Sequence, residues 1–162
     1  MNSPVAATPI RERGLRPRLS FPQLLRATAE ASPDAAALLA LDRPALTYAR
    51  LLAQIQSVVE TLRGLGIGRN DRVALALPNG PEGSLALLAV SSCATAAPLH
   101  PGYRQSEFEM QLRSLRAKAL LVSEGEGDSA RAAAQRVGLP VLELQTVPGA
   151  EAGVFKLRGP RI

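Results

Sequence analysis

Aromatic residues and cysteine are scarce in this chain of 162 residues. Phe, Tyr and Trp together make up 3% of the sequence, and Trp does not occur. A buried core must therefore be built mainly from Leu, Val and Ala. Cys93 is the single cysteine, which excludes a disulfide within the chain and indicates a reducing, cytoplasmic compartment.

Long apolar runs are missing as well. No run reaches the roughly 20 residues that a membrane-spanning helix needs, and the first residues lack the apolar stretch of a signal peptide. The sequence therefore predicts no membrane span. Its content of 46% apolar and 20% charged residues is typical of a globular domain that buries one core.

The formal net charge of +5 does not indicate a basic folded face. Residues 1–20 have a net charge of +3 and residues 151–162 of +2, while residues 21–150 hold equal numbers of acidic and basic residues. A nucleic-acid surface combines a basic stripe with aromatic side chains for stacking. Neither is present, so nucleic acid is not expected as a partner.

The first part of the body predicts helices and a short hairpin. A helix is expected from Ser20, and a hairpin over residues 36–48. A longer helix with near-ideal apolar spacing is expected after Thr47, which can cap it, and should end in the glycine-rich segment 64–68.

Beyond residue 70, short apolar runs alternate with helical patterns. A helix is expected over SEFEMQLRSLRA, residues 106–117, and it should begin with a capping box formed by Ser106 and Glu109. Strict alternation predicts an α/β fold, with a parallel, flavodoxin-like sheet, right-handed crossovers and helices on both faces. The runs that predict strands are 72–78, 97–99, 118–124 and 139–144.

Patterns that would indicate a phosphate or metal site are incomplete. GLGIGRND, residues 64–71, has closely spaced glycines but follows a helix, so a helix end and turn is favoured over a dinucleotide loop. SEGEGDS, residues 123–129, lacks the carboxylate that closes a calcium loop, because Gln135 stands there. No GxxxxGK[ST] loop occurs, and one Cys with one His cannot form a zinc site.

The single histidine, His100, stands between two prolines in APLHPGYRQSEFEMQL, residues 97–112. It follows a predicted strand, and open α/β sheets bind ligands at the carboxyl ends of their strands. No GxSxG elbow accompanies it, and Cys93 lies in an apolar pattern typical of a buried residue. A structural role is favoured for His100, and a ligand contact stays open.

Four stretches follow one another across residues 20–145: ALTYARLLAQI, LGIGRNDRVALALPNGPEGSLALLAV, APLHPGYRQSEFEMQL and AKALLV. In this order they resemble the opening segment of the AMP-forming adenylate ligases, the superfamily of acyl-CoA synthetases, luciferases and peptide-synthetase adenylation domains. The third stretch is most similar to the oxalyl- and fatty-acyl-CoA synthetase branch. Two positions depart from the family pattern: His100 replaces the usual Asn, and Cys93 the usual Gly.

The resemblance implies a parent enzyme that converts a carboxylate, ATP and CoA into acyl-CoA, AMP and pyrophosphate, with Mg²⁺. The family's phosphate loop and catalytic lysine have no counterpart in these residues, so no catalytic residue, metal site or cofactor is expected for this chain alone. The 98–104 loop is expected on the substrate or CoA side, with His100, Tyr103 and Arg104 as weak contact candidates. A solvated side chain beside a helix start is the favoured alternative for Arg104.

Three regions are therefore expected: a flexible basic leader over 1–19, an α/β subdomain over 20–145, and a tail or linker over 146–162 toward a missing remainder. The remainder of the parent ligase is the expected partner, and the apolar face that it would cover predicts self-association. A stand-alone, non-catalytic interaction domain is the alternative. A flavodoxin-like domain that binds a nucleotide or flavin is a further one.

Overall fold

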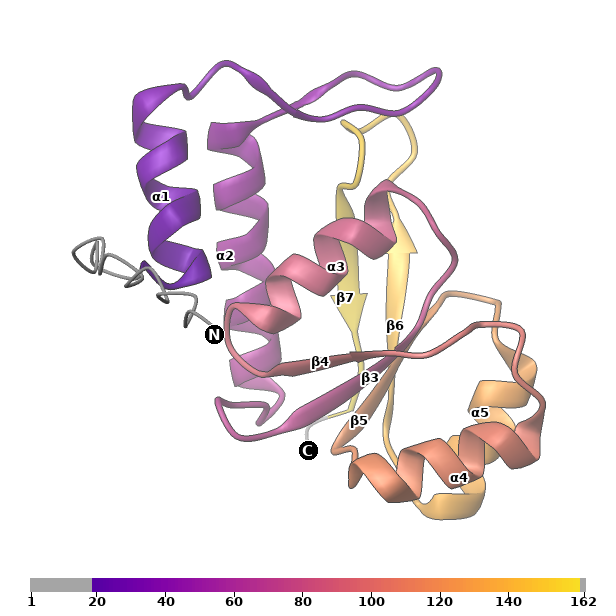
Figure 1. Ribbon diagram of the computed structural model, residues 1–162. Helices are drawn as coiled ribbons and strands as arrows, with labels where there is room; N and C mark the ends of the chain where they lie inside the picture. The colour runs from indigo at the N-terminus through magenta and orange to yellow at the C-terminus, as the bar shows by residue number, and fades with distance from the viewer. Residues whose placement is uncertain (1–18, 161–162) are drawn as a thin grey trace, which may run out of the picture.

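A five-stranded sheet lies between two layers of helices in the computed structural model, which describes residues 19–160 (Figure 1). The first four strands in sheet order run parallel, and the last runs antiparallel at one edge. Apart from Leu19, the predicted leader lies outside the described residues. In sheet order the strands are β4 (Thr95–Pro98), β3 (Arg72–Ala76), β5 (Ala119–Ser123), β6 (Val141–Thr146) and β7 (Phe155–Arg158).

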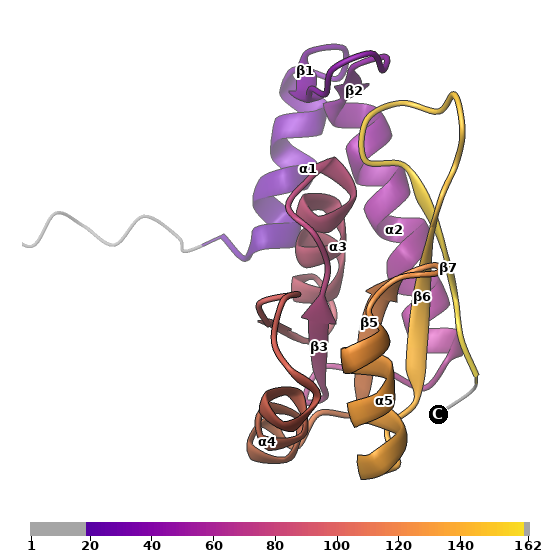
Figure 2. The same ribbon diagram turned by 90° about the vertical axis from the view of Figure 1, so that its right-hand side faces the viewer.

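Alternate side chains of β3, an inner strand of the sheet, enter two separate apolar layers. Val73 and Leu75 of β3 pack beneath α2 and α3, while Ala74 and Ala76 pack beneath α4 and α5. Helices therefore cover both faces of the sheet, as predicted, and α1 packs on α2 (Figure 2). The helices are α1 (Phe21–Ala31), α2 (Tyr48–Gly64), α3 (Pro81–Ser91), α4 (Gln105–Leu115) and α5 (Asp128–Val137).

Most local predictions are confirmed. Thr47 caps α2 by accepting a hydrogen bond from the Arg50 N–H at 3.3 Å. The hairpin forms, with shorter strands than expected: β1 (Ala36–Leu38) and β2 (Leu46–Thr47). Within residues 19–160, no helix combines the length and apolarity needed to cross a membrane.

The predicted capping box of α4 is wrong by two residues. The helix begins at Gln105, so Arg104 and not Ser106 is the residue before its first turn. Glu107 then lies where its carboxylate can reach back, and it accepts a hydrogen bond from the Arg104 N–H at 2.7 Å. Glu107 thus supplies the returning half of the box in place of Glu109, while the Arg104 side chain has no acceptor with which to supply the other half.

Strand β7 lies in the segment for which the sequence predicts no element. It pairs antiparallel with β6, with Glu143 opposite Arg158 and Thr146 opposite Phe155. With four residues, β7 is too short for its alternation of apolar and basic side chains to stand out as a pattern. The buried ring of Phe155 and the pairing with β6 hold it in the sheet.

Candidate functional site

A hollow of about 530 Å³ opens at the carboxyl ends of β3 and β4. Its walls are the turn that follows β3, the first two turns of α3, and residues 98–101 at the end of β4 and just after it. Leucine side chains, Leu87 among them, line it together with the polar side chains of Asn79, Ser84 and His100. Ligand sites in open α/β sheets occupy this position.

A second hollow, of about 300 Å³, adjoins the first across the segment 77–83. That segment lines both hollows. The second one is bordered on its other side by Ser123 at the end of β5, by Glu124 and Glu126 after that strand, and by Thr146 at the end of β6. The turn between β3 and α3 is therefore the element that any ligand in this region would contact.

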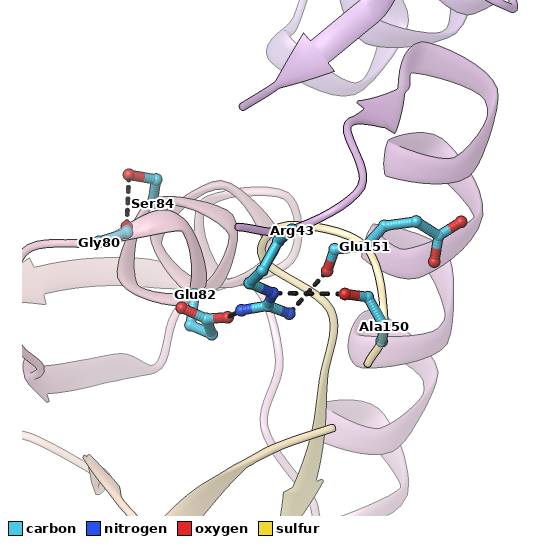
Figure 3. Close-up of polar contacts among 6 residues, drawn as sticks. All are labelled: Arg43, Gly80, Glu82, Ser84, Ala150 and Glu151. Carbon is cyan, nitrogen blue, oxygen red and sulfur yellow. Dashed lines mark hydrogen bonds and ion pairs between the residues drawn. The ribbon is translucent and has the colours of Figure 1, made fainter. Parts of the chain in front are cut away.

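A close backbone approach sets the shape of this turn. A Cβ atom on Gly83 would lie 2.7 Å from the carbonyl oxygen of Pro78, so only glycine fits there without a shift. Ser84 donates to the Gly80 carbonyl through its hydroxyl at 2.9 Å and through its N–H at 3.0 Å (Figure 3). The Ser84 contacts close the first turn of α3, and Gly83 lets that turn approach the backbone of Pro78.

Arg43 joins the start of α3 to the loop between β6 and β7 (Figure 3). Its guanidinium forms an ion pair with Glu82, and both side chains are largely buried, at 24% and 17% exposed. The same guanidinium donates to the carbonyl oxygens of Ala150, at 3.3 Å, and Glu151, at 2.7 Å. One side chain from the β1–β2 hairpin thus joins the start of α3, which lines the second hollow, to the β6–β7 loop.

The side chain of Glu151 continues this contact toward α2. Arg50 donates through Nε to Oε1 at 2.9 Å and through Nη2 to Oε2 at 3.3 Å, a two-point pairing of guanidinium and carboxylate. This hydrogen bonding by Arg50 is the main cause that lowers the pKa of the Glu151 carboxyl from its ordinary value. The same contact raises the pKa of Arg50.

The structure brings together two of the three predicted site residues. His100 borders the first hollow, and its Nδ1 accepts a hydrogen bond from the Gly102 N–H at 3.1 Å. Its ring centre lies 5.7 Å from that of Tyr103, which in turn contacts Phe108 edge-on. Arg104 is exposed and lines neither hollow.

No pattern in the sequence indicates the contacts of Arg43, Glu82 and Glu151. Arg43 stands 39 positions before Glu82 and 108 before Glu151, so no local spacing connects them. Arg43 lies in a predicted hairpin turn, where an exposed charge is the ordinary expectation. Only the tertiary arrangement reveals that its guanidinium is enclosed.

The charges around the hollows determine which chemistry these residues can support. No Lys or Arg lines either hollow, and the acidic residues at the second are Glu82, Glu124 and Glu126. No cluster of three or more potential metal ligands occurs among residues 19–160. The first hollow therefore suits a ligand with apolar and neutral polar groups, whereas the second offers carboxylates and no basic side chain that would pair with a phosphate.

A family model described as AMP-binding enzyme matches residues 25–154. A probable CoA ligase of Humulus lupulus, CCL9, is 35% identical over 129 residues, which is 79% of this chain and 24% of that protein. The oxalate–CoA ligase of Arabidopsis thaliana is 38% identical over 116 residues, 70% of this chain and 23% of that protein.

A benzoate CoA ligase from Burkholderia xenovorans LB400 has a similar fold, with a TM-score of 0.69 at 18% identity. The likeness covers 83% of this chain and 27% of that one. The chain thus spans about a quarter of the length of the curated relatives it matches.

Proposed function

Because this chain belongs to the AMP-binding enzyme family, as the N-terminal part of the acyl-CoA synthetase superfamily, we propose that it forms one wall of the substrate channel in an AMP-forming acyl-CoA synthetase. The parent enzyme would convert a carboxylate, ATP and CoA into acyl-CoA, AMP and pyrophosphate. The names of the relatives, CoA ligase and oxalate–CoA ligase, support this reaction class.

The hollow at the ends of β3 and β4 is the observation on which the proposal depends. Its leucines suit the methylene groups of an acyl or pantetheine chain, and Asn79, Ser84 and His100 offer hydrogen bonds to an amide or carbonyl. In this proposal the 98–104 loop faces the substrate or CoA. His100 and Tyr103 shape that loop, and Arg104 lies at its solvent side.

Residues of this chain would bind and orient the substrate. The groups that stabilise charge during the reaction would lie in the remainder of the parent enzyme. Attack of a carboxylate on the α-phosphate of ATP builds up negative charge that needs cations close by. Since neither hollow is lined by a basic side chain, those cations and the Mg²⁺ ligands would come from the remainder of the parent. We therefore propose that the 162-residue chain does not form an acyl adenylate alone.

The first test is the DNA that follows codon 162. An in-frame Ser/Thr/Gly-rich loop ending in Pro-Lys is expected, and a stop codon in its place would favour the stand-alone interaction domain. The second test measures carboxylate-dependent pyrophosphate release. We expect release from the full-length protein and none from the 162-residue chain. Release from the short chain would contradict the assignment of the cations to the remainder.

A further inference from the structure

The two edges of the sheet differ in the hydrogen-bonding groups that they leave free. In β4, the N–H of Thr95 bonds the Asp71 carbonyl and the N–H of Leu99 bonds that of Leu75. Because N–H groups alternate in direction along a strand, Ala96 and Pro98 are the residues of β4 that face outward. Proline has no N–H, so this edge cannot continue a ladder past Pro98.

The other edge, β7, keeps its donors and acceptors. On β6, the Leu144 carbonyl accepts from the Glu124 N–H, so Leu144 faces β5 and its neighbours Glu143 and Gln145 face β7. Their partners on β7 are Arg158 and Lys156. The N–H and C=O groups of the alternate residues, Phe155 and Leu157, therefore point away from the sheet.

One of these outward groups is already used. The Gln54 side chain on α2 donates to the Phe155 carbonyl at 2.6 Å, which confirms its outward direction. No hydrogen bond to another residue within 19–160 engages the outward N–H and C=O of Leu157. Leu157 thus offers one complete donor and acceptor pair to an added strand.

A groove lies along this edge. It has a volume of about 560 Å³ between α2 and β7, at the side of the molecule where α2, β6 and β7 run together (Figure 2). The α2 side supplies Ser57, Val58 and Thr61, and the β7 side supplies Leu157. Its free charges are positive: Lys156 and Arg158 are exposed, whereas Arg50 is paired with Glu151.

The two faces of β7 would be complemented by different kinds of side chain on a neighbouring strand. Leu157 points to the α2 face, where the apolar layer lies, and Lys156 and Arg158 point to the opposite face. A strand beside β7 would place an apolar residue next to Leu157 and acidic residues next to Lys156 and Arg158.

We propose that the outer edge of β7 binds an extended segment in which acidic and apolar side chains alternate, supplied by the part of the parent ligase outside this chain. The source of the segment rests on the proposed function; its chemistry follows from the edge itself. The relatives extend over about four times the length matched here, so ample chain is available. Strand addition of this kind obtains affinity from backbone hydrogen bonds and specificity from alternate side chains.

Two other occupants fit poorly. A second copy paired antiparallel about Leu157 would place Lys156 opposite the second copy's Arg158, and like charges in opposite positions repel. The N-terminal residues 1–20 have a net charge of +3, so they too would meet Lys156 and Arg158 with like charge.

The test uses the 162-residue chain and fluorescein-labelled heptapeptides. The acidic peptide Thr-Val-Glu-Val-Glu-Val-Thr is compared with its lysine counterpart, Thr-Val-Lys-Val-Lys-Val-Thr, by fluorescence anisotropy. The acidic peptide is expected to bind about tenfold more tightly, and the double variant Lys156→Glu/Arg158→Glu to reverse that order. Both substitutions lie on exposed side chains, so the fold is expected to persist, which circular dichroism checks.

An N-methyl group on the central valine of the acidic peptide distinguishes strand addition from simple charge attraction. It removes the N–H that would donate to the Leu157 carbonyl, so a loss of about tenfold in affinity is expected. Equal binding of the methylated and unmethylated peptides, or no saturable binding of the acidic peptide, would overturn the inference. Neither outcome bears on the proposed function, whose tests read the gene and pyrophosphate release.

Discussion

The guanidinium of Arg43 pairs with the carboxylate of Glu82 in the first turn of α3 while it also donates to two carbonyl oxygens of the β6–β7 loop. The pair links the β1–β2 hairpin, the turn that lines both hollows and the antiparallel edge of the sheet. Because both side chains are less than a quarter exposed, removal of either one leaves the polar groups of the other short of partners in a partly buried position.

Replacing Arg43 by alanine is expected to lower the free energy of unfolding by about 1–3 kcal/mol, measured by urea denaturation. A double-mutant cycle with Glu82→Ala should give a favourable coupling energy of about 1 kcal/mol or more. Arg26→Ala is the matched control, since Arg26 is exposed on α1 and forms no ion pair within the described residues. A coupling energy near zero would contradict the role assigned to Arg43.

Replacing Gly83 by alanine is expected to destabilise the protein by about 1–3 kcal/mol, because the new Cβ would press on the Pro78 carbonyl and force the turn to open. Gly64→Ala is the control. Gly64 ends α2 with no atom within 4 Å of a Cβ built there, so the same change should be neutral or stabilising by up to about 1 kcal/mol. Thermal unfolding of the two variants side by side checks both signs.

The contact between Asp71 and Lys118 predicts a loss of stability in acid. The Gly68 N–H donates to Asp71 at 2.7 Å and Lys118 at 2.9 Å, and both contacts, that of Gly68 first, lower the pKa of the Asp71 carboxyl. A carboxyl with a lower pKa in the folded state stabilises the fold above its unfolded-state pKa of about 4. That contribution is lost as the pH falls through the folded-state pKa.

Asp71→Asn is therefore expected to reduce the unfolding free energy by about 1 kcal/mol at pH 7, and the difference from the native sequence should shrink as the pH falls below the unfolded-state pKa of about 4. Asp34→Asn serves for comparison, since Asp34 is exposed and forms no ion pair among residues 19–160. Urea midpoints across the acid range provide the measurement. A gap that stays constant with pH would show that the charge of Asp71 does not matter.

Filling the first hollow is expected to impair substrate binding in the full-length protein. Leu87 lines the hollow and is 37% exposed, so Leu87→Trp can occupy the space with little cost to the core. The KM for the carboxylate or for CoA should rise about tenfold. Leu24→Trp, at a position 53% exposed on α1, should leave both constants unchanged. Unchanged constants in both variants would remove the hollow from the substrate channel.

The isolated chain is expected to self-associate through exposed leucines. Leu39 and Leu41 at the β1–β2 hairpin are 74% and 92% exposed, which is unusual for neighbouring large apolar side chains. Leu41→Glu should shift the light-scattering mass at high concentration toward the monomer, whereas Leu24→Glu on α1 should have less effect. A monomeric native chain at high concentration would contradict this prediction.

The fold was largely predictable because its signals are local. Thr47 stands at the start of a long apolar stripe, so both the cap and the helix could be placed from spacing alone. Strand β7 could not be predicted, because only the burial of Phe155 and the pairing of the strand with β6 make it a strand. The site was less predictable, because its contacts also depend on tertiary structure. His100 could be placed beside a strand end, but the contacts of Arg43 join residues more than a hundred positions apart.

The separation of Arg43 from the β6–β7 loop has a consequence for synthesis on the ribosome. The hairpin, α2 and α3 are made first, and their local contacts can form as they emerge. The Arg43 guanidinium can donate to the Ala150 carbonyl only after a further 107 residues have been synthesised. Before Ala150 is synthesised, the Arg43 guanidinium can pair with Glu82 but not with the β6–β7 loop. The link between the start of α3 and the β6–β7 loop is therefore completed only late in synthesis, after most of the sheet has been made.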